Sequence, residues 1–75
     1  MAKTYVYKFI MKDGSLEYAA GVDISASKYG LIYVKDAAGE KVKIVPQKNV
    51  AKVSKLLFES EDACYSYYAK VRGLL

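Results

Sequence analysis

The residue with the strongest intrinsic reactivity in this sequence is Cys64, the single cysteine of the chain. A thiolate is a good nucleophile, and a position near the start of a helix lowers a thiol pKa. A catalytic cysteine is usually activated by a neighbouring base, yet the sequence contains no histidine, the commonest base near neutral pH. Cys64 also falls on the apolar stripe of a predicted helix, which is typical of a cysteine that fills a core. We therefore expect it to have a structural role.

The carboxylates predict neither a catalytic site nor a metal site. Asp13 and Asp36 fall in predicted turns. Glu61 and Asp62 suit the first turn of a helix, where negative charge complements the helix dipole. Glu59 lies nearby, but the three together lack the alternating ligand spacing of a calcium-binding loop. A single cysteine without histidine does not complete a zinc site. We therefore expect no enzyme activity, no metal and no cofactor.

Tyrosine is the most unusual part of the composition, with eight in 75 residues. An amphipathic ring with few rotatable bonds is a favourable contact residue at protein interfaces. Three of the eight cluster on the predicted C-terminal helix, and one core does not bury all three. At about 100° per residue, Tyr65 is rotated away from Tyr68 to the edge of the apolar stripe, with Tyr67 a further step round. Tyr65 and Tyr67 are therefore the candidate interface residues.

Lysine supplies nearly all of the positive charge of the chain, which is +4 overall. Arg72 is the only arginine, so the forked contacts typical of sequence-specific DNA recognition are not indicated. Lysines on strands beside flat tyrosine rings do suit single-stranded nucleic acid, because its backbone attracts positive charge and its bases stack. Outward lysines equally keep the edge of a sheet soluble. The candidate nucleic-acid-binding residues are Lys35, Lys41, Lys43, Tyr29 and Tyr33.

The length and the N-terminal pattern indicate the class of protein. Seventy-five residues suffice for one domain, 1–75. No apolar segment with a cleavage site precedes the first strand pattern, and the longest apolar runs are far shorter than a membrane span. A lone cysteine fits a reducing compartment. We expect a cytoplasmic domain without membrane contact. A homo-oligomer is a further expectation, because chains this short often need a partner for stability.

Alternating apolar residues predict the strands that position these side chains. Asp13-Gly14 is typical of a tight hairpin between the first two strands. Ala20-Gly21, within the second strand, predicts a bulge or a sharp bend. In the fourth strand, Val42 and Ile44 are expected to face inward. The expected strands span about 3–12, 15–24, 29–36, 40–46 and 50–57.

The segment 50–57 fits two kinds of element. As a strand, it closes a barrel after four preceding strands. As a helix, it has Asn49 as a good N-cap, with Val53 and Leu57 on one stripe. We prefer the strand.

The segment 61–72 predicts a helix, with Ser60 as its N-cap and Gly73 as its natural end. In strand count and turn spacing the chain resembles small SH3-like or Sm-like barrels. We therefore expect a mainly β fold, a five-stranded antiparallel barrel with a C-terminal α-helix. The alternative is an α+β fold in which a four-stranded sheet is followed by one or two helices.

The function that this pattern favours is a non-catalytic binding module that mediates protein–protein interaction or self-association. Its basis is the excess of aromatic and apolar residues in so short a chain. The alternative is a small β-barrel that binds nucleic acid without sequence specificity.

Overall fold

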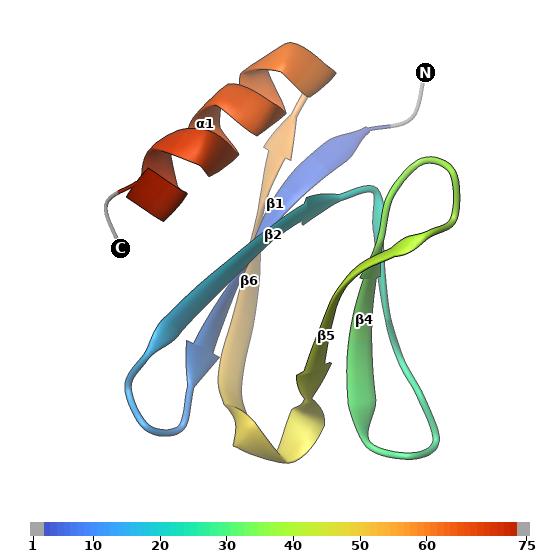
Figure 1. The fold of residues 1–75 in the computed structure, drawn as a ribbon, viewed down its shortest axis with the longest axis vertical. Helices are drawn as coiled ribbons and strands as arrows, with labels where there is room; N and C mark the ends of the chain where they lie inside the picture. The colour runs from blue at the N-terminus through green and yellow to red at the C-terminus, as the bar shows by residue number, and fades with distance from the viewer. Residues whose placement is uncertain (1–2, 74–75) are drawn as a thin grey trace.

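The computed structural model describes residues 3–73 and shows a mainly β fold with a C-terminal helix (Figure 1). Within this part of the chain, two three-stranded antiparallel sheets form, in the orders β2-β1-β6 and β3-β4-β5. The strands are β1 (Thr4–Met11), β2 (Leu16–Gly21), β3 (Asp23–Ala26), β4 (Leu31–Lys35), β5 (Lys41–Pro46) and β6 (Val50–Phe58). A short 3₁₀ helix, η1 (Gln47–Asn49), links β5 to β6, and the helix α1 (Glu61–Gly73) follows. No helix among the described residues is long and apolar enough to cross a membrane.

The expected second strand, 15–24, is divided at Val22 into β2 and β3, which belong to different sheets. The N–H of Val22 donates to the carbonyl oxygen of Lys35 at 2.8 Å, which anchors the bend to β4. A Cβ at Gly21 would lie 2.5 Å from that same oxygen and 2.7 Å from Cγ1 of Val34. Only glycine fits this close approach, so the bend predicted at Gly21 is the point where the chain passes from one sheet to the other.

The two sheets are not closed into a barrel. In the described residues no strand pairing joins β5 to β6, and each is the outer strand of its own sheet. The coarser expectation, a mainly β fold with a C-terminal helix, is confirmed. The segment 50–57 lies in a strand: β6 pairs with β1 from Phe58 to Val50, with one register shift at Ala51, opposite Ile10 and Met11.

The larger core lies between the two sheets. Tyr7, Phe9 and Met11 project from one face of β1 and are buried against Val34 of β4 and Val45 of β5. This is the face of the first strand that alternation in the sequence indicates. Burial of these large apolar side chains stabilises the packing of one sheet against the other.

A second, smaller core lies under α1, on the opposite face of the β2-β1-β6 sheet. Val6 of β1, Ala20 of β2 and Cys64 of α1 are buried there, with Tyr67 packed at the margin. Figure 1 shows α1 on the side of this sheet away from β4 and β5. The helix begins where expected, because the N–H of Ala63 donates to Oγ of Ser60 at 3.1 Å.

The inward orientation expected for Val42 and Ile44 is wrong. Their side chains are 48% and 52% exposed, whereas Val45 is the buried residue of β5. The other face of β5 therefore points to the core, and Lys43 lies on it. Its Nζ is 2.6 Å from Oε1 of Glu17 on β2, so an ion pair between the sheets takes the place of an apolar contact.

Candidate interaction surface

The strand β6 is the most exposed strand of the fold. It pairs with β1 on one side only, from Val50 opposite Met11 to Phe58 opposite Thr4. Every residue from 51 to 57 is exposed. The other edge of β6 has no strand partner among residues 3–73, and an unpaired edge of this length is a template for pairing with another chain.

Alternation of the backbone fixes which groups of β6 lie at its free edge. The N–H of Met11 donates to Ser15 on the β2 side, at 2.9 Å, and that of Lys12 donates to Asn49 on the β6 side, at 2.8 Å. Odd residues of β1 thus direct their backbone groups to β2, and even residues direct theirs to β6. From Lys52 to Phe58, the even residues of β6 lie opposite even residues of β1. The backbone N–H and C=O groups that remain at the free edge belong to Val53, Lys55 and Leu57.

The side chains of β6 combine apolar and basic groups. Val53, Leu56 and Leu57 are between 37% and 48% exposed. Lys52 and Lys55 are the charged residues of the strand, which contains no carboxylate. Lysines protect a free edge from indiscriminate aggregation. Exposed aliphatic side chains grouped at one edge are typical of contact surfaces.

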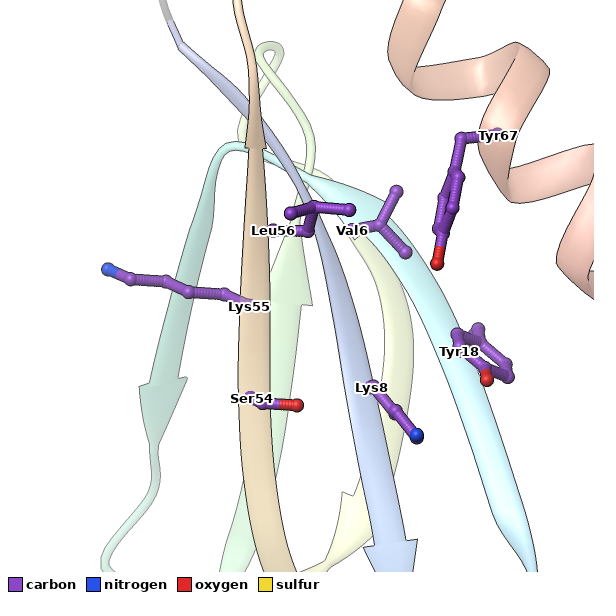
Figure 2. A pocket seen from close by; sticks show the side chains of 7 residues that line it. All are labelled: Val6, Lys8, Tyr18, Ser54, Lys55, Leu56 and Tyr67. Carbon is purple, nitrogen blue, oxygen red and sulfur yellow. The ribbon is translucent and has the colours of Figure 1, made fainter.

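A hollow of about 220 Å³ opens beside β6, between its sheet and α1 (Figure 2). In Figure 2, Val6 and Leu56 form its apolar floor, and Tyr67 reaches down toward them from α1. Lys8, Tyr18 and Ser54 lie on the same side, whereas the Lys55 side chain projects to the other side of the strand. The lining residues are Val6, Lys8, Tyr18, Ser54, Lys55, Leu56 and Tyr67, with no carboxylate among them.

The size of this hollow suits one side chain. Pockets for small-molecule ligands usually enclose about 300–1,000 Å³, which is more than this hollow holds. Because it adjoins the free edge of β6, a side chain on a strand paired with that edge is well placed to enter it.

Cys64 lies outside this surface and is completely buried. Burial raises the pKa of its thiol, and the charge of Glu61 raises it further. Reactive cysteines have a lowered pKa and partial exposure. The environment of Cys64 is therefore that of a core residue.

Comparison of the chain with protein-family models, curated proteins and solved structures gave no match.

The two candidate interface tyrosines of α1 lie in different environments. Tyr67 is half-buried, with its ring centroid 5.3 Å from that of Phe58, and it lines the hollow beside β6. Tyr65 is 47% exposed and does not line the hollow. The structure thus brings Tyr67 to the β6 surface and leaves Tyr65 outside it.

Most of the candidate nucleic-acid-binding residues lie together on the outer face of the β3-β4-β5 sheet. Tyr33 and Lys35 share that face of β4, and Nζ of Lys41 lies 4.1 Å from the centre of the Tyr33 ring. Tyr29 is exposed in the turn before β4. Lys43 is separated from them, because it points to the other face of the sheet and pairs with Glu17.

Sequence reasoning missed the contact residues of β6, because the strand was expected to close a barrel and so to have both edges paired. The adjacent pair Leu56-Leu57 carried a signal, since neighbours in a strand point to opposite faces. One leucine on each face of a strand that also holds Lys52 and Lys55 indicates that neither face is fully covered. The hollow itself was not predictable, because Lys8 and Tyr18 join it only through the register of three strands.

Proposed function

We propose that this chain is a non-catalytic interaction module that binds a protein segment by strand addition to the free edge of β6. The observation that carries the proposal is the exposure of β6 from 51 to 57, with one edge unpaired. In strand addition, backbone hydrogen bonds supply affinity, and pockets for alternate side chains supply specificity. The hollow beside Leu56 is such a pocket.

The arrangement of the sheets supports this proposal. We propose that they are an open form of the small SH3-like barrel expected from the sequence, since one strand bent at Val22 supplies both sheets. Closure between β5 and β6 would have paired the edge that strand addition requires. In the open form that edge stays available.

The test compares two substitutions at Lys55, whose N–H lies at the free edge. Lys55→Pro removes this donor without removing a bond to β1, and proline is tolerated at an edge when its nitrogen faces solvent. Lys55→Ala removes the same side chain, including its contact with the Tyr5 ring at 4.9 Å, but keeps the donor. The probe is a pool of ten-residue peptides in which apolar and polar residues alternate.

We expect the wild-type chain and Lys55→Ala to bind the pool, with perturbation of the β6 amides in nuclear magnetic resonance spectra, and Lys55→Pro to lose binding. Thermal unfolding of both variants checks that each is folded. Equal binding by the proline and alanine variants, or perturbation that leaves the β6 amides unchanged, would contradict strand addition.

A second candidate function is binding of single-stranded nucleic acid on the outer face of the β3-β4-β5 sheet. The observation in its favour is the grouping of Lys41, Lys35 and Tyr33 on that face. Binding of a labelled oligonucleotide pool at low salt, weakened by Lys41→Gln and unchanged by Lys43→Gln, would support it, because only Lys41 lies on this face. If the oligonucleotide pool does not bind even at low salt, where electrostatic attraction to phosphates is strongest, nucleic-acid binding is ruled out.

A further inference from the structure

The chemistry of β6 and its hollow indicates what kind of segment would pair there. Resting on the strand addition proposed above, we propose that the occupant is an extended segment of a different protein in which acidic side chains alternate with apolar ones. The alternatives are a second copy of this chain and a segment of any polar composition.

The positive charge of β6 and its hollow is not balanced by nearby carboxylates. Lys52 and Lys55 project from β6, one to each face, and Lys8 lines the hollow. Neither the strand nor the lining contains a carboxylate. Glu17, on β2, is already engaged 2.6 Å from Lys43 on the other side of the sheet. Three ammonium groups that form no ion pair with a carboxylate of residues 3–73 favour carboxylates on the occupant.

The second step concerns a second copy of the chain. Among the described residues its outer strands are β2, β3, β5 and β6; β5 contains Lys41 and Lys43 but no carboxylate, whereas β2 and β3 each contain one, Glu17 and Asp23. Pairing β5 or β6 of the second copy with β6 brings lysines next to lysines, and like charges on neighbouring strands are destabilising. Pro46 also lacks the N–H that a ladder requires at the end of β5. In β2 the carboxylate of Glu17 is already paired with Lys43, and β3 offers Asp23 alone over four residues. A segment of a different chain with several carboxylates therefore matches the charge of the site better.

The third step places the side chains of the occupant. On the α1 side, they lie beside Lys52, Ser54 and Leu56, and one enters the hollow. Its floor is apolar, and its rim carries the Lys8 ammonium with the hydroxyl of Tyr18. This combination fits a side chain with a short apolar stem and a terminal carboxylate. Because successive residues of a strand point to opposite faces, the apolar side chains of the occupant lie on the other side, where they cover Val53 and Leu57 beside the Lys55 ammonium.

The experiment uses three ten-residue peptides with the same apolar residues and with glutamate, serine or lysine at every polar position. Fluorescence anisotropy at low salt measures their affinities for the intact chain. We expect the glutamate peptide to bind about tenfold more tightly than the serine peptide, the combined effect of a few exposed ion pairs. We expect this advantage to shrink as salt rises and the lysine peptide not to bind.

The matched variants are the double substitutions Lys52→Gln with Lys55→Gln, and Lys48→Gln with Lys70→Gln. Each pair lowers the net charge equally, and the second pair lies outside β6, in η1 and α1. We expect only the first pair to remove the advantage of the glutamate peptide. Equal loss in both pairs would mean that overall charge, not this site, selects the peptide, and would overturn the proposal.

The remaining outcomes separate this proposal from strand addition itself. If the glutamate and serine peptides bind equally and both protect β6 amides from hydrogen exchange, the acidic preference is wrong while strand addition stands. If no peptide binds but the chain forms a dimer with protected β6 amides, the occupant is a second copy, which also overturns the proposal. If no partner protects those amides, both proposals fail.

Discussion

Cys64 is completely buried beside Val6 and Ala20, in the small core under α1. Burial raises the pKa of its thiol above the ordinary value of 9.0, with a further contribution from the charge of Glu61. The unfolded chain therefore releases this proton at lower pH than the folded chain does. The free energy of unfolding is unaffected below about pH 9 and falls as pH rises through the folded pKa.

We expect urea denaturation to show a fall in stability between about pH 9 and about pH 11 that is smaller in Cys64→Ala than in the wild type. Tyr7, whose pKa burial also raises, contributes equally to both at the upper end of this range. The alanine variant is less stable at every pH, because the substitution leaves a cavity. The quantity to compare is therefore the change in the free energy of unfolding with pH, not its value at one pH. Equal changes would show that the thiol does not titrate differently on folding.

Residue-level prediction from the sequence succeeded where spacing alone decides burial. Cys64 falls on a helical stripe, and the stripe is buried as the spacing indicates. It failed for Ile44, because both faces of β5 carry apolar residues and Val45 competes for the core. The decisive partner of Lys43 is Glu17, 26 positions away. No local pattern reveals an ion pair of that kind.

At the scale of elements, the bend between β2 and β3 determines how the two sheets are joined. Gly21 lies against the backbone of Lys35, where a Cβ would meet the carbonyl oxygen at 2.5 Å. We expect Gly21→Ala to lower the free energy of unfolding by about 1–3 kcal/mol, or more, because the backbone oxygen cannot move aside as a flexible side chain would. Denaturant unfolding measures this change.

The matched control is Gly73→Ala at the end of α1, where a Cβ meets nothing within 4 Å. We expect this variant to change stability by less than about 1 kcal/mol. A Gly21→Ala chain as stable as the control would mean that the two sheets separate easily at this bend. Their junction would then not be held in the close contact that the structure shows.

The elements themselves were largely predictable, whereas their closure was not. Alternation of apolar residues indicated β1. The Ser60 cap and a helical stripe predicted a helix over 61–72, and the observed α1 is Glu61–Gly73. Ala20-Gly21 indicated a bend, but local sequence does not say that a bend divides one strand between two sheets. Whether β5 pairs with β6 depends on side chains distant in sequence, so the open edge became visible only in the fold.

At the scale of the whole molecule, the exposed outer strands β5 and β6 favour association, whereas a net charge of +4 opposes it. Exposed aliphatic side chains on β5 and β6 favour association, whereas the lysines of both strands repel those of a second copy. Repulsion dominates where salt is low, because charges act over about 10 Å at 0.1 M ionic strength and only about 3 Å at 1 M. A partner with acidic groups removes this conflict, and a second copy does not.

This balance predicts that the chain is monomeric at low ionic strength and associates as salt rises. Light scattering coupled to size exclusion, at fixed protein concentration over a series of salt concentrations, measures the change. The variant with Lys52→Gln and Lys55→Gln should associate at lower salt than the one with Lys48→Gln and Lys70→Gln, because only the first pair lies on the free edge. A dimer that forms at low salt and dissociates as salt rises would indicate ion pairs between copies. In that case the lysines of β6 would serve self-association, and the charge argument for an acidic partner would lose its basis.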